Sequence, residues 1–414
     1  MEHEDIMFEN IIGHKSLVEQ LEKEIKSDSF PSSVLISGPL YSGKQTIALE
    51  IARALTCEQD ASWNCKCQSC RQHRVLANPQ VVLLGWDLFM PEIFAVKNVL
   101  EKKKDNISCY LFIRGVRKLL RRFDSVLLEE NDSKFKKIAL GAGNVEELLE
   151  NFDPESKIEP KNIDIKAAQT IVEQCKTIVN EYNFTSIPVD QIRKVSYWIR
   201  FSGHGSKKII IIENAENMND SSRNALLKIL EEPPDNTFFI LLTSRPGEII
   251  PTIKSRLRKY EIAERSIQEN KTVIERIFKE ESGIFTGIKE YLDSAIPEIA
   301  VVKKAAKQFM VDLYDNSKEH RGLSHEIKNI LKPQFSEYYL SFLAEILNLS
   351  RELLQNSEFI NNNPGNVIFI KKINKLINES YKGFEKLNIN QELLTESMFL
   401  ELKRDYEKFY KKSC

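Results

Sequence analysis

The chain has 414 residues, of which 59 are basic and 60 acidic, so its formal net charge is -1. This length is too great for one ordinary hydrophobic core, and we expect roughly two to four domains. A net charge near zero argues against a protein that binds nucleic acid through its overall charge, so any contact of that kind must be local.

The N-terminal residues show no signal for export. The sequence MEHEDIMFEN lacks the basic and then apolar pattern of a secretory signal, and no stretch of the chain approaches a membrane span of about 18 apolar residues. We therefore expect a cytoplasmic protein that has no association with a membrane.

A phosphate-binding loop is predicted close to the N-terminus. The run SVLIS at 33–37 indicates a strand, and a helical pattern begins after the sequence GPLYSGK at 38–44. This sequence matches G-x-x-x-x-G-K in the strand, loop and helix context that the motif requires. Backbone N–H groups of such a loop point at phosphate oxygens, and the lysine reaches the β- and γ-phosphates. The candidate nucleotide ligands here are Gly38, Ser42, Gly43, Lys44, Gln45 and Thr46.

The residue after the lysine departs from the motif. A working loop carries Ser or Thr there, whose hydroxyl binds Mg²⁺, whereas this chain has Gln45 and places Thr46 one residue later. One residue is a rotation of about 100° on a helix, which turns Thr46 away from the metal. We expect that ATP or ADP can bind and that Mg²⁺ binding and hydrolysis are impaired. The alternative is a vestigial loop that binds nothing.

A cluster of cysteines follows the phosphate loop. Four of the seven cysteines have the pattern C-x7-C-x-C-x2-C. In a reducing compartment this clustering favours a metal over disulfides, and four thiolates are typical of a closed, structural Zn²⁺ site. Free thiols or a partial site are the alternatives, with His73 at best a substitute ligand. The predicted zinc ligands are Cys57, Cys65, Cys67 and Cys70.

The stretch 86–185 interrupts the alternation of strands and helices with lysine-rich and glutamate-rich segments, and we interpret it as an insertion. Within it, basic residues recur at spacings of three and four, which places them near one helical face. Such a face could follow a phosphate backbone, although acidic neighbours and few aromatic residues favour an ordinary solvated face. The residues concerned are Arg114, Lys118, Arg121 and Arg122.

The run IIII at 209–212 predicts a central parallel strand buried on both faces. An acidic motif follows this strand. An active ATPase of this type needs two successive carboxylates after that strand, one for Mg²⁺ and one for the attacking water. This chain has Glu213, which could still approach the metal and is a further candidate cofactor-binding residue, and Asn214, whose amide cannot accept a proton. Replacement of the missing carboxylate by Glu216 or Asp220 is not favoured by helical geometry.

The rest of the chain completes the predicted fold class. A helix precedes Pro233 and Pro234, a third strand is indicated at 238–243, and the pattern becomes almost entirely helical from about residue 263. Strands that alternate with helices predict an α/β domain with a parallel sheet covered on both sides.

Taken in order, these motifs resemble the clamp-loader branch of the AAA+ ATPases, in the group of the bacterial DNA polymerase III gamma/tau and delta-prime subunits. The sequence FENIIGH at 8–14 is similar to the opening of the family, in which the backbone at Ile11 and Ile12 lies beside adenine. The cysteine cluster is placed as in the family, which usually spaces the last three cysteines C-x2-C-x2-C. The resemblance is also carried by NALLKILEEPP at 224–234, TIKSR at 252–256 and the final helical segment at 387–402.

The resemblance implies a domain organisation and one catalytic residue. It implies an AAA+ P-loop domain at 1–262, a small helical lid at 263–312 and an all-helical collar for oligomerisation at 313–414. In the family, the pair that matches Ser255 and Arg256 donates an arginine finger to ATP bound by the adjacent subunit. An ordinary surface arginine is the alternative for Arg256.

Within the family, gamma subunits hydrolyse ATP and delta-prime subunits complete one side of a gamma ATP site. The residues Gln45 and Asn214, together with an intact Arg256, favour the delta-prime type. The implied function is ATP-dependent loading of the sliding clamp onto primed DNA, with gamma/tau and delta subunits as partners and clamp and primer-template DNA contacted through the complex. The alternatives are an ATP-hydrolysing gamma/tau-type motor and a stand-alone zinc-containing nucleic-acid binder.

Overall fold

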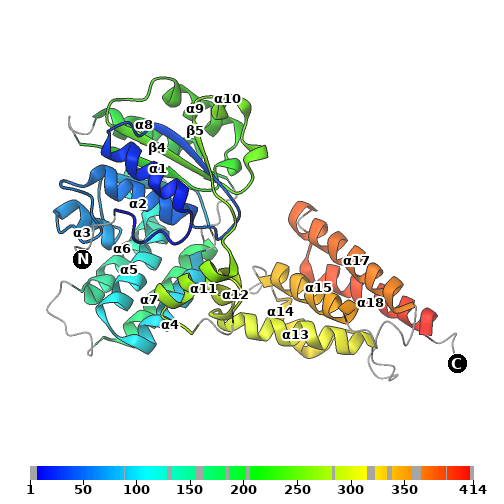
Figure 1. The fold of residues 1–414 in the computed structure, drawn as a ribbon. Helices are drawn as coiled ribbons and strands as arrows, with labels where there is room; N and C mark the ends of the chain where they lie inside the picture. Colours follow the sequence, from blue (N-terminus) through cyan, green and yellow to red (C-terminus); the bar gives the residue numbers. More distant parts are fainter. Residues whose placement is uncertain are drawn as a thin grey trace. The chain divides into compact units, whose positions relative to one another are not determined.

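The fold is drawn in Figure 1 from a computed structural model. Two compact units divide the chain, Met1–Ala295 and Ile296–Cys414. The last residues of the predicted insertion, 182–185, lie outside the described residues, as do parts of the predicted lid and collar. The structure describes residues 7–87, 89–127, 133–154, 163–181, 186–201, 206–281, 285–314, 322–332, 338–355, 365–387 and 389–410.

The first unit is built on a five-stranded sheet in the order β2-β3-β4-β1-β5, in which every neighbouring pair is parallel. The predicted parallel α/β sheet and its three predicted strands are therefore confirmed. The edge strands β2 and β5 were not predicted. The strands are β1 (Ser33–Ser37), β2 (Val81–Leu84), β3 (Lys208–Ile212), β4 (Thr237–Thr243) and β5 (Arg258–Glu261).

Helices cover both faces of this sheet. Successive residues of each strand point to opposite sides, and the apolar side chains on both sides need a covering layer. On one face Ile36 and Ile211 pack with α1 (Lys15–Lys26) and α2 (Lys44–Thr56). On the other face, Leu35 and Ile210 are in one cluster with residues of two further helices, α8 (Val189–Phe201) and α9 (Asp220–Glu231). All five residues of β3 are buried, as expected for a central strand of a doubly covered sheet.

Most of the segment predicted as an insertion is helical. After the short α3 (Gln68–Arg74) and strand β2, helix α4 packs against α5 and α7, and α6 packs against α7. A 3-10 turn, η1 (Arg121–Phe123), extends α5 and contacts β2. The four helices are α4 (Phe89–Lys103), α5 (Asn106–Leu120), α6 (Ser133–Leu149) and α7 (Ile165–Glu181).

The remaining described elements are helical apart from β5. In the first unit the remaining described α-helices are α10 (Pro251–Lys254), α11 (Ile267–Arg276) and α12 (Ile288–Ser294), and the 3-10 turns are η2 (Ser125–Leu127), η3 (Glu150–Phe152), η5 (Ala215–Asn217) and η6 (Pro246–Glu248). Unit two contains α13 (Pro297–Tyr314), α14 (His325–Ile330), α15 (Tyr339–Gln355), α17 (Gly365–Leu387) and α18 (Gln391–Tyr410).

Helix α13 belongs to the second unit, where it packs on α15 and α18 and buries Phe309 against Phe342 and Phe399. The predicted division into a lid ending at residue 312 and a collar starting at 313 stays a prediction. Among the described residues, no helix is long and apolar enough to cross a membrane.

Candidate nucleotide and metal sites

The phosphate loop lies between β1 and α2, at the carboxyl edge of the parallel sheet. The Lys44 ammonium donates hydrogen bonds to the carbonyl oxygens of Gly38 (2.8 Å) and Pro39 (2.5 Å), and burial lowers the pKa of Lys44. The hydroxyl of Ser42 donates to the Pro39 oxygen at 2.7 Å, and the Nε2 atom of His14 donates to the Ser42 oxygen at 2.8 Å. The loop is therefore held in a curled form by its own side chains and by the N-terminal segment.

The side chain at the predicted metal position is bonded to the acidic motif. The amide Nε2 of Gln45 donates to Oε1 of Glu213 at 2.5 Å, so the structure brings together two residues that are 168 positions apart. Thr46 follows on α2 and is half-buried. The position that a Mg²⁺-binding hydroxyl occupies in a working loop is thus taken by an N–H donor.

A buried guanidinium pairs with the other oxygen of the same carboxylate. The Nη2 atom of Arg122 lies 2.7 Å from Oε2 of Glu213, and the two side chains are only 2% and 3% exposed. Arg122 also donates to the Leu84 oxygen at 3.1 Å and lies over the ring of Phe89. Both oxygens of Glu213 are engaged and its charge is compensated, which disfavours a divalent cation at this place.

The residues around the missing carboxylate are bonded mainly to their own neighbours. Asn214 has a left-handed backbone (φ 47°), and its amide donates to the Trp86 oxygen at 2.7 Å. Glu216 is buried and accepts hydrogen bonds from Ser244, while Asp220 pairs with Arg223 at 3.2 Å. The contacts of Asn214 and Glu216 hold the turn after β3 together, and Glu216 also lies in the electrostatic surroundings of Lys44.

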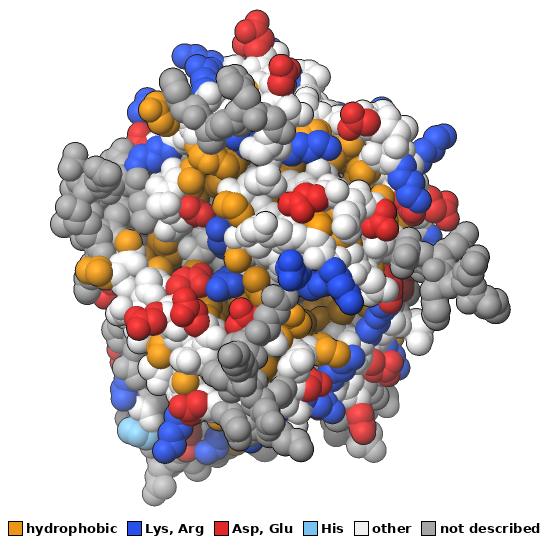
Figure 2. Space-filling view, turned by 90° about the vertical axis from the view of Figure 1, so that its left-hand side faces the viewer, with side chains coloured by type: hydrophobic (Ala, Val, Ile, Leu, Met, Phe, Trp, Pro, Cys, Tyr) orange, Lys and Arg blue, Asp and Glu red, His pale blue; other side chains and the backbone are white. Residues whose placement is uncertain are grey.

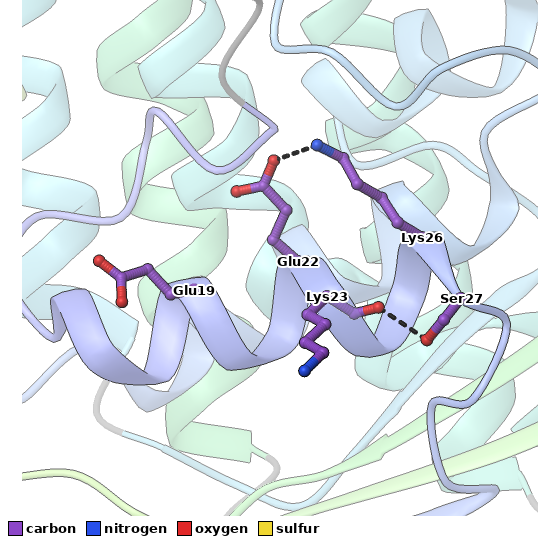
Figure 3. Close-up of a pocket in the computed structure, with 5 residues that line it drawn as sticks. All are labelled: Glu19, Glu22, Lys23, Lys26 and Ser27. Atoms are coloured by element: carbon purple, nitrogen blue, oxygen red, sulfur yellow. Dashed lines mark hydrogen bonds and ion pairs between the residues drawn. The ribbon is translucent and has the colours of Figure 1, made fainter.

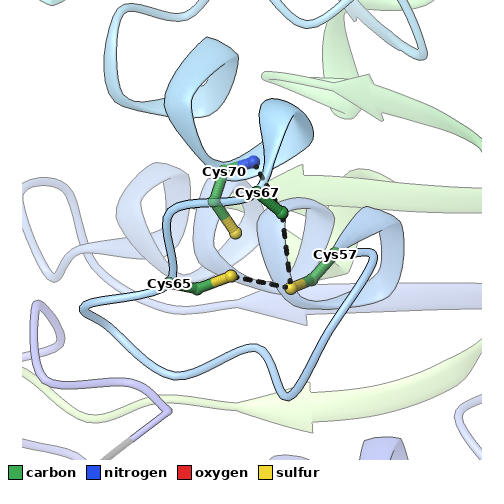
Figure 4. A group of neighbouring side chains, drawn as sticks. All are labelled: Cys57, Cys65, Cys67 and Cys70. Atoms are coloured by element: carbon green, nitrogen blue, oxygen red, sulfur yellow. Dashed lines mark hydrogen bonds between the residues drawn. The ribbon is translucent and has the colours of Figure 1, made fainter.

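The four cysteines predicted as zinc ligands come together at the end of α2 and the start of α3 (Figure 4). Their sulfur atoms all lie within 4.8 Å of one another, with Cys57 at 3.6 Å from Cys65 and 3.8 Å from Cys67. A tetrahedron with Zn–S bonds of about 2.3 Å has edges of about 3.8 Å, so the sulfur atoms are spaced as zinc requires. Cys57, Cys65, Cys67 and Cys70 thus form a candidate metal site that is compatible with zinc.

His73 is not a member of this cluster. Its Nε2 atom lies 2.7 Å from the hydroxyl of Thr56, and burial lowers the pKa of His73 to about 3. The ring is therefore neutral and serves the packing of α3 against α2.

One buried arginine ties the cysteine loop to the N-terminal segment. Arg53 of α2 donates to the oxygens of Ala61 (3.1 Å) and Ser62 (3.2 Å) in the loop, and to the oxygen of Met7. Its Nε atom pairs with Glu50 at 2.8 Å. No local pattern in the sequence indicates this residue, because its partners lie in two separate segments.

The predicted arginine finger is at the surface. Arg256 follows α10 and is about one-third exposed, with Nη1 donating to the Thr252 oxygen at 2.8 Å and Nη2 pairing with Glu231 at 2.6 Å. Ser255 turns back on the same turn, since its hydroxyl also donates to the Thr252 oxygen. The guanidinium is oriented by two neighbours and remains accessible.

The chain was compared with the models of known protein families. The model of the family described as "DNA polymerase III, delta subunit" matches residues 13–134 and 145–266, which is more than half of the chain. The chain belongs to this family. The matched ranges include the phosphate loop, the cysteine cluster, the acidic motif and Arg256, together with much of the segment 86–185.

The chain is also similar to proteins named DNA polymerase III subunit delta' or subunit gamma/tau. The DNA polymerase III subunit delta' of Buchnera aphidicola (subsp. Schizaphis graminum) is 34% identical over 162 residues, which cover 38% of this chain and 47% of the relative. The subunit delta' of Escherichia coli is 34% identical over 88 residues, covering 21% and 26%. The subunit gamma/tau of Mycobacterium bovis is 42% identical over 53 residues, covering 13% and 9%. The chain spans less than half of the length of each of these relatives.

Among solved structures, a DNA polymerase III gamma subunit-related protein of Thermotoga maritima aligns over 94% of this chain and 99% of its own. The sequence identity is 14% and the TM-score 0.38.

The predicted basic face of this family member points inward, so the favoured interpretation as a solvated face is wrong, and these side chains are not available as the alternative, a face along a phosphate backbone. Arg114 donates to the His73 oxygen at 2.7 Å, Arg121 to the Asn78 oxygen at 3.0 Å, and Lys118 pairs with Glu92 at 2.6 Å. Arg122 is the buried partner of Glu213 described above. On the face shown in Figure 2, acidic and basic side chains are interspersed.

A depression on α1 is not a convincing ligand site. It is open to solvent and lined by charged side chains of one helix and its C-terminal end (Figure 3). Lys26 pairs with Glu22 at 2.6 Å, and Ser27 donates to the Lys23 oxygen at 2.8 Å. These contacts are ordinary surface and helix-capping interactions, and nothing converges on an enclosed space.

Proposed function

We propose that the chain is a delta-prime-type subunit of the clamp loader of the bacterial replicative DNA polymerase III holoenzyme. In this role it completes the ATP site of a neighbouring subunit and does not hydrolyse ATP efficiently itself. Membership of the DNA polymerase III delta subunit family supports the assignment. The observation that carries it is the occupation of both Glu213 oxygens by Gln45 and Arg122.

In this proposal the chain's own hydrolysis is weak, because other groups occupy the places of the metal ligand and of the base. Mg²⁺ needs oxygen ligands in near-octahedral geometry, and the groups at its expected place are an amide N–H and a guanidinium. The attacking water needs a proton acceptor, and the amide of Asn214 instead donates to the Trp86 oxygen. The loop around Lys44 keeps the residues that hold phosphate in the motif, so binding of ATP or ADP is a separate question from hydrolysis at this site.

Arg256 supplies the catalytic contribution to the neighbour. A guanidinium presents several fixed donors to the charge that develops on a transferring phosphoryl group, which lowers the barrier without a proton transfer. Here Glu231 and the Thr252 oxygen hold two edges of the guanidinium, which limits the rotamers that must be frozen when ATP is contacted. Ser255 stabilises the turn on which it stands.

The cysteine site has a structural role in this proposal. Zinc, when bound, would cross-link the end of α2 to the start of α3 through Cys57, Cys65, Cys67 and Cys70. Three of the four residues are buried and no open ligand position is implied, so the site would fix the loop and not a substrate.

The proposed partners follow from the family. They are the gamma/tau and delta subunits, with the sliding clamp and primer-template DNA contacted through the assembled complex. The helices of the second unit, α13 to α18, are the proposed collar through which the subunits join.

The test of the proposal is the ATPase rate of a loader reassembled with its motor subunits and DNA. Replacing Arg256 by Ala is expected to slow the site that it completes by on the order of 10³-fold, while assembly stays intact. Arg193→Ala is the matched control, since Arg193 is also a surface arginine paired with an acidic residue, Asp190 at 3.0 Å. An ATPase rate that Arg256→Ala leaves unchanged would remove the assigned role.

The alternative function is a gamma/tau-type motor, and the purified chain distinguishes the two. We expect negligible turnover with Mg²⁺ and ATP. Turnover at ordinary ATPase rates that is abolished by Lys44→Ala would overturn the proposal in favour of the motor.

A further inference from the structure

Arg265 lies across the predicted nucleotide pocket. It follows β5 and directly precedes Ser266, the N-cap of α11. Its Nε atom donates to the Ile12 oxygen at 3.3 Å, and Nη1 donates to the Tyr41 oxygen at 2.9 Å. One guanidinium therefore joins the N-terminal segment, the phosphate loop and the start of α11.

The third nitrogen of this guanidinium lies against Gly43. A Cβ atom built on Gly43, whose φ is +96°, would be 2.2 Å from Nη2 of Arg265. Glycine at this position of a phosphate loop leaves room for close approach of the phosphate to the backbone. In this chain the room beside Gly43 is filled by Arg265.

The partners of Arg265 are peptide oxygens and not a carboxylate. Burial lowers the pKa of Arg265, and the acidic group in its electrostatic surroundings is Glu269. Glu269 is itself bonded to the backbone N–H and hydroxyl of Ser266, at 2.8 and 2.9 Å, and would touch a Cβ atom on Gly13. The first turn of α11 is thus seated on the same two segments that a nucleotide would contact.

We propose that Arg265 is an internal occupant of the nucleotide pocket, which excludes nucleotide and keeps α11 attached to the phosphate loop in its absence. A nucleotide with its base beside Ile12 and its phosphates on the loop at Gly43 would have to displace this guanidinium. The inference rests on the proposed function only in taking this pocket as the nucleotide site. In this inference Arg265 stabilises the nucleotide-free state. Such a state suits a subunit that does not need to bind and release ATP in each cycle.

The experiment is calorimetric titration of the purified full chain with ADP, comparing wild type and Arg265→Ala. If the occupied state holds at least about nine-tenths of the molecules, removing the guanidinium raises the apparent affinity by about tenfold or more. Arg193→Ala is the matched control, because Arg193 stands on α8 and pairs with Asp190 at the surface, and its affinity should equal that of wild type. Adding Lys44→Ala to Arg265→Ala should abolish the gain, which places the new binding at the phosphate loop.

An affinity that is unchanged or lower in Arg265→Ala overturns the inference, and a lower affinity would make Arg265 a phosphate ligand instead. Failure of both proteins to bind ADP also overturns it. Arg265→Gln, which removes the charge and keeps a polar side chain, provides the comparison if the alanine variant does not fold. The outcome is independent of the Arg256 assay, because that assay measures ATP hydrolysis by the motor subunits. A gain of turnover in Arg265→Ala would count against the proposed function alone, since Arg122 still pairs with Glu213.

Discussion

At the scale of single residues, the decisive feature is that both oxygens of the Glu213 carboxylate are bonded within the chain, to Gln45 and to Arg122. Two departures in the sequence, Gln45 and Asn214, predict a weakened reaction, and Gln45 does contact the carboxylate. Arg122 could not be predicted in this role. It lies 91 positions from Glu213, and its basic neighbours suggested an exposed face. A contact of this kind depends on how η1 meets the end of β2, which no local pattern reports.

The pair of Arg122 and Glu213 makes a prediction about stability. Arg122→Met should lower the free energy of unfolding by about 3 to 5 kcal/mol, because it leaves a buried carboxylate without its partner. The double variant Arg122→Met with Glu213→Gln should recover most of that loss, since no charge then remains to be paired. Urea unfolding followed by circular dichroism measures both. Equal stability of the single variant and wild type would contradict the description of the pair as a compensated buried charge.

His73 makes a prediction about pH. Its pKa in the folded chain is lowered to about 3 by burial, whereas the unfolded chain keeps an ordinary value near 6.5. Between these values the unfolded state binds more protons, so stability falls as the pH falls, by about 1.4 kcal/mol per unit for this group. The stabilisation from the neutral ring is present above about pH 6.5 and is lost toward pH 3.

The measurement is the difference in unfolding free energy between wild type and His73→Gln from pH 7 to pH 5. That difference should shift in favour of the variant as the pH is lowered, because the variant has no group to protonate there. The cysteine cluster is common to both proteins, so its own response to acid cancels. A difference that does not change with pH would mean that the folded ring titrates normally.

At the scale of elements, helix α5 shows what periodicity can and cannot tell. The spacing of Arg114, Lys118 and Arg121 correctly places them on one side of a helix. It does not say that this side faces the molecule, where Arg114 and Arg121 donate to peptide oxygens between His73 and Val81. An arginine can be buried when its donors are satisfied by carbonyl oxygens at a helix end or strand edge.

The strands were predictable to different degrees for a related reason. The runs of β1, β3 and β4 are long and apolar because both of their faces are covered. The four residues of β5, RKYE, include only one that is buried, and those of β2 are too few to distinguish a strand from a short buried loop. A charged edge strand such as β5, and a short apolar one such as β2, both carry little periodic signal.

The element formed by the cysteine loop makes a prediction about metal content. Purified protein should contain one zinc per chain, and Cys65→Ser should reduce that content and lower the melting temperature, because one ligand of a closed site is lost. Cys109→Ser is the control, since Cys109 is also buried but lies on α5, away from the cluster. Elemental analysis and thermal unfolding give both quantities. Full zinc retention by Cys65→Ser, or equal loss in Cys109→Ser, would contradict the assignment.

At the scale of the whole molecule, the sequence predicted the parallel α/β sheet followed by helices, and family membership is established over more than half of the chain. The division of the helical part was harder to place, because helix follows helix without a change of composition. In the structure Phe309 of α13 packs on α15 and α18, and the second compact unit begins at Ile296. The proposed role gives different tasks to two places in the chain. The phosphate loop at Lys44 does not hydrolyse ATP, and the exposed Arg256 contributes to the ATP site of a neighbour.

The measurement that tests this separation most directly is the DNA-stimulated ATPase of the reassembled loader with two variants of this chain side by side. Lys44→Ala should leave the rate at the wild-type value, because this chain's own pocket contributes no hydrolysis. Arg256→Ala should lower the rate, because a neighbour's ATP loses its guanidinium. A loader that is slowed by Lys44→Ala and unaffected by Arg256→Ala would contradict the account.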